Sequence, residues 1–557
     1  MTDLPGRAVY LDAVAAQAPR LLGLINRNSA SATYGCFDRS YWHYRVVDTP
    51  SARCQEAVLT LALLHHLSES PYRGKDTLLA WARAGMDFWR SQQRPDGSFD
   101  EWYPNEHSFV ATAFSAYAVA ETRLLCDRAP GGGEAAIDAG LARAGRWLLK
   151  TSEARALNQL AGSTAALYNI FLVTGEREFE RGARERLGVL GRRQSREGWF
   201  PEYGGADIGY LSLAIAYLGQ LYRKAGWPEA LEIASASMEF IKMFLHRDGT
   251  AGGEYSSRLT EYLIPDGFEI FARESSAART ISRFVRDSLR TGRGVSLPAF
   301  DDRYLTYVGS NFLEAYRHAV VDVSAEEPVV SPGRRGVFML FNEAGLAVIR
   351  DETYEGVVNL HRGGAFKFVF KNGATLSDAG LIAVTPKRGP LYAGYWDEAV
   401  DQRVDDRRVT VRGRLRQVEE RPLAPWSNIV FRAFQLTVGR LAGVGLRLKD
   451  LLRNVIIMPR ARRRVEYERI IEVDSDRISV ADRVRWAGRQ ADVQTVVLGV
   501  RNSFPYTPSS KFFNTADLDD RPLVLSPSAA DCRHGYIEVS RRYSLDGELC
   551  ETTMRAG

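Results

Sequence analysis

Cysteine is scarce and scattered in this chain. There are five in 557 residues, at positions 36, 54, 126, 532 and 550, and no two stand at the CxxC spacing of a metal or redox site. The odd number and wide spacing argue against a disulfide scaffold and against a cysteine zinc site. We therefore expect a reduced, cytoplasmic setting, with no metal and no cofactor.

Long apolar runs and strong charge are lacking too. No stretch of about 20 apolar residues is present, so we expect no membrane-spanning helix. Asp3 and Asp12 interrupt the apolar start of the chain, which also lacks the basic opening of a signal peptide. The net charge of +5 is small for this length and argues against a nucleic-acid partner, although a local basic patch can still face an anionic substrate.

A recurring pattern organises the first half. In the segment 194–222 a helix ends at a Gly turn, a loop of aromatic and acidic residues follows, and a new apolar helix opens. Asp207 is placed to accept hydrogen bonds from the free N–H groups of that helix, and Tyr210 lies in its first turn. Echoes occur at 92–121 and 246–272. The chain thus reads as a series of helical hairpins.

The spacing of the pattern gives the number of hairpins. The turns at Gly97, Gly198 and Gly249 are separated by about 50 residues or twice that. The same pattern of turn, loop and apolar helix recurs near Thr151, from Pro298 and, at a longer spacing, from Tyr34. We predict a closed ring of about six hairpins, because the second helix of each hairpin is apolar all round and must be buried. The loops before these inner helices would then meet at one end of the ring and line one cleft.

The second half has strand patterns. Helical periodicity fades after His318, the segment 323–335 reads as a linker, and runs such as 336–351 and 365–380 alternate as strands. Asn372-Gly373 predicts a hairpin turn. We predict an α+β multidomain protein: an N-terminal (α/α) toroid over residues 1–322 and a C-terminal antiparallel β-sandwich over 336–557.

One insertion interrupts the strands. Residues 426–458 are helix-like, amphipathic and basic, and Arg460 and Arg462–Arg464 follow them. The simpler interpretation is a helix packed on the sandwich. The alternative is peripheral contact with an anionic membrane, since basic amphipathic helices bind such surfaces.

A toroid of helical hairpins followed by a β-sandwich resembles the heparinase II/III-like and alginate-lyase-like polysaccharide lyases. The segment 157–180 is similar to the family's Asn-headed inner helix, which places Asn158 at the functional Asn. The segment 197–218 is similar to the loop and helix with the functional Tyr, which places Tyr210 there with Tyr203 in reserve. The segment 359–380 is similar to the His-bearing strand pair, with His361 at the functional His. The family's second His and Asp after that position are replaced by Gly and Ala, which weakens any expectation of a structural metal.

The resemblance implies β-elimination on an anionic polysaccharide or oligosaccharide that contains uronic acid. Asn158 would neutralise the uronate carboxyl group, and Tyr210 and His361 would transfer protons. An arginine would pair with the carboxylate, and the loops supply further binding groups. The substrate-binding candidates are Arg39, Arg45, Trp102, His107, Glu202, Tyr203 and Arg362.

Other roles for the same residues stay open. Asn158 can be a helix N-cap, Tyr210 a plug of the ring, and His361 a core histidine. A glycoside hydrolase would need two carboxyl groups. The acidic candidates for that role are Asp100, Glu101, Glu202, Asp207 and Glu254. A non-catalytic glycan-binding protein of exopolysaccharide biosynthesis is the third interpretation.

Overall fold

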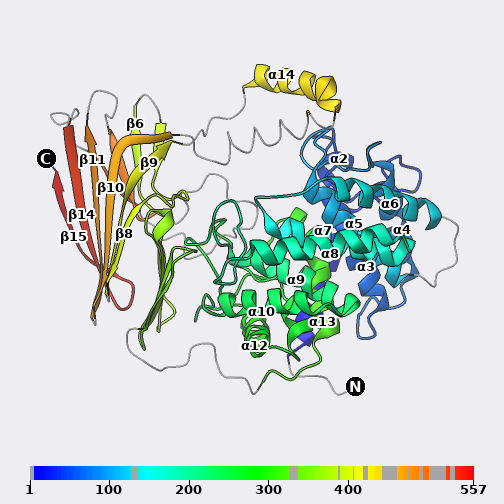
Figure 1. Cartoon of the computed structure of the whole chain (residues 1–557), viewed down its shortest axis with the longest axis horizontal. Helices are drawn as coiled ribbons and strands as arrows, with labels where there is room; N and C mark the ends of the chain where they lie inside the picture. The colour runs from blue at the N-terminus through cyan, green and yellow to red at the C-terminus, as the bar shows by residue number, and fades with distance from the viewer. Residues whose placement is uncertain are drawn as a thin grey trace.

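Helices fill the first half of the chain and strands the second (Figure 1). The computed structural model describes residues 6–126, 134–324, 337–386, 389–405, 407–417, 424–441, 444, 461–474, 476–487, 493–500, 522–526 and 534–556. The last helix of the first half ends at His318, and the first strand begins at Val337.

Six inner helices form a closed ring. They are α3(Ala57–His66), α5(Phe109–Leu125), α7(Leu157–Thr174), α9(Ile208–Ala225), α11(Asp266–Phe271) and α13(Asp302–His318). Each contacts the next, and α13 contacts α3, so the ring is complete. The predicted toroid of about six hairpins is therefore confirmed.

Six outer helices surround the ring. They are α1(Ala8–Leu24), α4(Asp76–Ser91), α6(Glu134–Lys150), α8(Arg177–Arg193), α10(Pro228–Lys242) and α12(Ser276–Thr291). They carry their charges on the outward side and bury the other, as amphipathic helices do. Short helices α2(Arg39–Trp42), η1(Ala52–Glu56) and η2(Leu297–Ala299) lie in the loops between hairpins.

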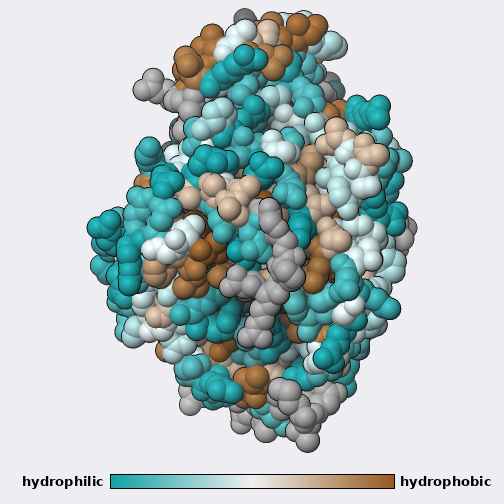
Figure 2. Space-filling model, turned by 90° about the vertical axis from the view of Figure 1, so that its right-hand side faces the viewer, coloured by the Kyte–Doolittle hydropathy of each residue, from teal (hydrophilic) through white to brown (hydrophobic). Residues whose placement is uncertain are grey.

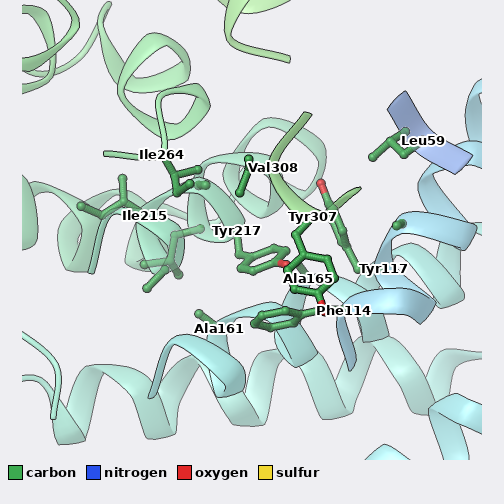
Figure 3. Packing of buried hydrophobic residues seen from close by; sticks show 14 of the residues in the cluster. Leu59, Phe114, Tyr117, Ala161, Ala165, Ile215, Tyr217, Ile264, Tyr307 and Val308 are labelled. Carbon is green, nitrogen blue, oxygen red and sulfur yellow. The ribbon is translucent and has the colours of Figure 1, made fainter. Parts of the chain in front are cut away.

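Aromatic rings fill the space inside the inner helices (Figure 3). The ring of Tyr217 lies 4.9 Å from that of Phe114 and 5.0 Å from that of Tyr117, measured between centroids. Because the inner helices meet such neighbours on every side, their apolar sequence pattern has no polar face.

The glycine turns fit under neighbouring helices. Gly97 and Gly198 have φ angles of +97° and +95°. A Cβ atom at Gly97 would stand 2.3 Å from the carbonyl oxygen of Arg143, and one at Gly198 would stand 2.2 Å from that of Ala236. Both the backbone conformation and the close approach therefore require glycine.

The strands form two antiparallel sheets. The first has five strands in chain order: β1(Val337–Phe341), β2(Leu346–Arg350), β3(Tyr354–Asn359), β4(Ala365–Phe370) and β5(Thr375–Asp378). The second has ten strands, with the order β13-β12-β6-β7-β9-β10-β11-β14-β15 and β8 paired to β9. Its members are β6(Ile382–Thr385), β7(Gly389–Tyr392), β8(Asp401–Asp405), β9(Arg408–Gln417), β10(Ala461–Val473), β11(Arg477–Ala487), β12(Thr495–Leu498), β13(Leu523–Leu525), β14(His534–Ser544) and β15(Leu549–Ala556). The predicted antiparallel sandwich is confirmed, as is the turn at Asn372-Gly373 between β4 and β5.

The five-stranded sheet is a middle layer. Leu346 and Val348 of β2 belong to the core of the toroid, whereas the alternate residues Ala347 and Ile349 belong to the core of the sandwich. Successive side chains of a strand point to opposite faces. The sheet therefore joins the two domains through a continuous apolar contact.

The described part of the insertion after β9 lies elsewhere than expected. The structure describes α14(Pro425–Leu436) and η4(Val438–Arg440), while 442–443 and 445–460 lie outside the described residues. Arg432 pairs with Asp48 at 3.2 Å, and the side-chain amide of Asn105 donates to the Gln435 carbonyl oxygen at 2.9 Å. For this described part, the expected packing on the sandwich is wrong, because α14 finds its partners on loops of the toroid (Figure 1). No helix among the described residues is long and apolar enough to cross a membrane.

Candidate active site

The loops that precede the inner helices, called leading loops below, carry unusual backbone. Among the described residues, the non-glycine residues with positive φ are Arg45, Asn105, His107, Tyr203 and Leu259. All five lie in leading loops. Backbone strain of this kind costs about 1–3 kcal/mol per residue and gathers at functional sites. The strain points to this end of the toroid as the place of the site.

A cavity of about 70 Å³ opens among the inner helices at this end. Its lining comprises Arg53, Glu56, Val110, Phe114, Asn158, Gln159, Tyr203, Tyr210, Leu213, Tyr217, Tyr262, Ile264, Tyr304, Tyr307, Val308 and Asn311. The volume has room for about five to seven water molecules, at about 10–15 Å³ each. It admits a substituent such as a carboxylate, whereas a sugar ring must lie across its mouth.

Asn158 is a lining residue of the cavity and not a helix cap. It is the second residue of α7, whose N-cap position is held by Ala156 without a side-chain hydrogen bond. The missing cap is replaced from another loop, since the Glu202 carboxylate accepts the backbone N–H of Asn158 at 2.8 Å. The N-cap interpretation of Asn158 is wrong, and its side-chain amide is left to face the cavity.

Asp207 holds two loops together. Its carboxylate caps α9 through the N–H of Tyr210 at 3.1 Å, which confirms the predicted cap. It also accepts the backbone N–H of Arg258 at 2.8 Å and the Thr260 hydroxyl at 2.5 Å. These bonds come from the next leading loop, so Asp207 fixes Arg258 and Tyr210 relative to each other.

The two candidate tyrosines meet in the cavity. Burial raises the pKa of Tyr210 well above its usual value, so its phenol keeps its proton at neutral pH. Tyr203 lies in the strained loop, and the Arg258 guanidinium stands over its ring, 4.7 Å from the centroid. The charge of Arg258 also acts on Tyr210, where it opposes the effect of burial on the pKa. One cation therefore lies near both phenols.

The cavity also holds a buried ion pair that the sequence analysis did not single out. Arg53 bonds Glu56 at 2.7 Å, and its guanidinium lies 3.7 Å from the centroid of the Tyr307 ring and 4.8 Å from that of Phe114. Burial raises the pKa of Glu56 to about 7, against the opposing pull of Arg53. The one available signal was position, because Arg53 lies in a leading loop just before an inner helix.

An exposed tryptophan extends the contacts of Tyr307 to the surface of the protein. Trp102 is 65 % exposed, and the Arg303 guanidinium lies 3.6 Å from the centroid of its ring. Arg303 also bonds Glu101 at 2.7 Å and the Tyr307 hydroxyl. Trp102 therefore sits at the surface, one arginine away from a tyrosine of the cavity.

His361 lies at the junction of the domains and does not line the cavity. It is buried, and its ring meets Trp396 edge-on at 4.8 Å. Trp396 in turn covers the loop with Tyr203, since a Cβ atom at Gly205 would stand 2.5 Å from its ring. Burial lowers the pKa of His361, which leaves its imidazole neutral at pH 7. One tryptophan thus contacts both His361 and the tyrosine loop.

Comparison with solved structures agrees with this architecture. The chain aligns with chondroitin AC lyase from Streptomyces coelicolor A3, solved in complex with chondroitin sulphate, at a TM-score of 0.57 and 11% identity, over 89% of this chain and 68% of that one. The fold is that of the toroid polysaccharide lyases. Heparinase III aligns over 100% of this chain and 89% of its own, at 10% identity and a TM-score of 0.46. No protein-family model matches the sequence, and no curated protein matches it either.

Six of the seven predicted binding residues lie outside the cavity lining: Trp102, Glu202 and the four described next. His107 is buried against Asp96, 2.8 Å away. Arg362 is buried and donates to the carbonyl oxygens of Glu254, Ser256 and Gly394. Arg39 lies over Tyr44, 5.2 Å from the centroid of its ring, and Arg45 is exposed.

The acidic residues of the leading loops are used within the protein. Asp100 accepts the backbone N–H groups of Asn105 and His107, and Glu101 bonds Arg303. Glu202 and Asp207 hold helix ends, as described above. Among the described residues that line the cavity, Glu56 is the one carboxyl group. A hydrolase needs two that flank the bond, and the described lining supplies one.

Proposed function

We propose that the protein cleaves an anionic polysaccharide containing uronic acid by β-elimination. The observation that carries the proposal is the common cavity of Asn158, Arg53, Tyr203 and Tyr210. These residues come from three different parts of the chain and supply an amide, a cation and two phenols. Those groups are what the elimination requires.

The first requirement is neutralisation of the uronate carboxylate. The proton at C5 is too weakly acidic to leave while the neighbouring carboxylate keeps its full charge. The Asn158 amide can donate a hydrogen bond to the carboxylate, and the Arg53 guanidinium can pair with it. A carboxylate fits the small cavity, and the sugar ring stays at the mouth.

The second requirement is transfer of the proton. The C5–H bond breaks, its electron pair forms the C4–C5 double bond, and the C4–O bond breaks so that the departing oxygen takes up a proton. Tyr203, beside Arg258, suits the base, and Tyr210, which keeps its proton, suits the acid. His361 can serve in either step only if Trp396 moves aside, and its role stays a prediction.

Product analysis tests the proposal. A panel of acidic polysaccharides is incubated with the protein, and ultraviolet absorbance and new reducing ends are both measured. An unsaturated, ultraviolet-absorbing product supports elimination. New reducing ends without absorbance would indicate a hydrolase, and binding without any product would indicate a glycan-binding protein.

A second proposal concerns the membrane, and the exposed face of α14 favours it. Trp426 and Ile429 are each 69 % exposed and Val430 is 59 % exposed, at the i, i+3, i+4 spacing of one helix face. Figure 2 shows hydrophobic residues gathered at the top of the molecule, where Figure 1 places α14. Arg440, which is exposed, follows the helix and adds a positive charge to this segment. We propose peripheral contact with anionic membranes, as suits a role in exopolysaccharide synthesis.

Liposome co-sedimentation tests the membrane contact. The protein should sediment with anionic vesicles at low salt and much less at high salt, because screening weakens the charge attraction. Replacing Trp426 and Ile429 by serine should abolish sedimentation without loss of the fold. Equal sedimentation of this variant and the wild type would refute the contact.

A further inference from the structure

A second hollow, of about 340 Å³, lies at the rim of the toroid. It runs between the end of α12 and the turn after α10. We call it the arginine groove, and define it by Arg247, Arg283, Phe284, Arg290 and Arg293. Asp287 is the one acid among its lining residues, and Glu355, outside the lining, pairs with Arg247 at 3.8 Å. Four guanidinium groups therefore have two carboxylates as partners.

The arginines of the groove differ from a structural arginine on the same helix. Arg286 of α12 is buried and forms two hydrogen bonds with the carboxylate of Glu269, at 2.9 and 2.5 Å. Arg290, by contrast, is 66 % exposed and shares Asp287 with Arg283, at 3.0 and 3.5 Å. Arg293 is exposed, and its guanidinium forms no hydrogen bond or ion pair with any residue that the structure describes, although its backbone N–H donates to the Ser288 carbonyl oxygen at 3.1 Å. Positive charge in the groove therefore exceeds what the protein itself neutralises.

The groove lies at the same end of the toroid as the cavity. Each outer helix ends where the next leading loop begins, so the last turn of α12 belongs to that end. The turn with Arg247 is fixed to the middle sheet, because its guanidinium donates to the carbonyl oxygens of Asp351 and Glu352 at 3.1 and 3.0 Å. The same leading loop continues to Arg258 and to Tyr262, which lines the cavity. One loop therefore borders both hollows.

We propose that the arginine groove binds a sulphated or carboxylated sugar unit of an acidic polysaccharide, as a second site apart from the cavity. The choice of ligand rests on the proposed function, because a chain crossing this end of the toroid can meet both hollows. The volume lies in the range of small-ligand sites. Guanidinium groups bind sulphate and carboxylate through paired hydrogen bonds. The partly buried ring of Phe284 supplies an apolar floor for a sugar.

Equilibrium binding of a chondroitin sulphate tetrasaccharide tests the groove, by calorimetry at fixed ionic strength. The double variant Arg290→Ala, Arg293→Ala removes two charges of the groove and leaves the cavity untouched. The control Arg181→Ala, Arg192→Ala removes two exposed charges from α8, outside both hollows. We expect the dissociation constant to rise about tenfold or more in the groove variant, which is about 1.4 kcal/mol, and less than twofold in the control.

Three results would overturn the inference. Equal weakening in both variants would mean general charge attraction. Inorganic sulphate could also compete with the tetrasaccharide. If it binds the groove as tightly as the tetrasaccharide does, the groove is a plain anion site. Wild-type binding that the groove variant leaves unchanged would place the sugar elsewhere. Because binding is measured without turnover, a failure of the elimination proposal would show separately, as absence of an ultraviolet product.

Discussion

The guanidinium of Arg258 lies over the ring of Tyr203, 4.7 Å from its centroid, while the backbone N–H of Arg258 donates to Asp207. Asp207 also caps the helix that begins beside Tyr210. One buried carboxylate therefore sets the positions of a cation and two phenols. The geometry of the proposed proton transfer rests on that residue.

Removal of either phenol should stop elimination and spare the fold. We expect Tyr203→Phe and Tyr210→Phe each to lower kcat by about 10²–10⁴, the range for loss of one proton-transfer group. Ultraviolet product formation measures this, and circular dichroism checks the fold. Tyr168→Phe is the control, since Tyr168 packs on Trp227 and does not line the cavity. Full activity of Tyr210→Phe would remove that residue from the mechanism.

The Arg53–Glu56 pair offers a test of carboxylate binding. Replacing Arg53 alone would strand a buried carboxylate, at a cost of about 3–5 kcal/mol in the free energy of unfolding. The double variant Arg53→Gln, Glu56→Gln removes both charges, so stability should fall less than in Arg53→Gln. We expect kcat/KM on a uronate polymer to fall about 10²-fold or more, because the substrate carboxylate loses its cation. Unchanged kcat/KM with an intact fold would assign the carboxylate to another partner.

Glu56 also predicts a pH dependence of stability. Its folded pKa of about 7 lies above its ordinary value of 4.5, so the folded protein holds this proton more tightly. The resulting stability is fully present below pH 4.5 and is lost as pH rises through 7, by at most about 3 kcal/mol. Burial also raises the pKa of Asp266 to about 7. Asp266 therefore adds to the loss of stability as pH rises. Urea unfolding at pH 5 and 8 should show a smaller difference for Glu56→Gln than for wild type, whereas the exposed Glu229→Gln should match wild type.

His361 and Trp396 can be tested together. If Trp396 moves aside when substrate binds, His361→Ala should lower kcat by about 10²–10⁴. Trp396→Ala should then leave kcat near the wild-type value while it changes KM. If His361 only packs at the domain junction, His361→Ala should lower the melting temperature and leave kcat within about threefold. Activity and thermal unfolding of the two variants distinguish these outcomes.

The sandwich core contains a closed cycle of buried charges. Arg469 and Arg541 each pair with both Asp378 and Asp482, at 2.6–3.1 Å. Burial alone would raise the pKa of Asp378. The two guanidinium groups outweigh this effect and hold that pKa at about 2. We expect Asp378→Asn to lower the unfolding free energy by about 3–5 kcal/mol at pH 7. The contribution of Asp378 should fade as pH falls from 3.8 towards 2. Glu551→Gln, which breaks the exposed pair with Arg542, should cost under about 1 kcal/mol.

The sequence was informative where the cause of a structure is local. The glycine turns, the Asp207 cap and the apolar inner helices are set by neighbouring residues, so the toroid could be predicted. Asn158 and Tyr210 line the same cavity because each lies in the first turn of an inner helix, and the inner helices of the ring begin at the same end. Their shared cavity follows from the repeat.

Other features depend on docking between distant segments. Arg53 looked like any loop arginine, because its partners Tyr307 and Phe114 are remote in sequence. The position of α14 depends on Asp48 and Asn105, more than 300 residues before it. Arg469 lies in a strand rich in charged residues, and it is fully buried against Asp378 and Asp482. Periodicity carries no information on such pairings.

The capping bonds between leading loops have a consequence for how this toroid can change. Glu202 belongs to the fourth hairpin but completes the helix of the third, and Asp207 of the fourth takes its other bonds from Arg258 and Thr260 of the fifth. A hairpin transplanted alone would arrive with an unfinished helix and leave another behind. Repeats of an open solenoid can be exchanged singly, whereas loops of this ring must be altered as neighbouring sets.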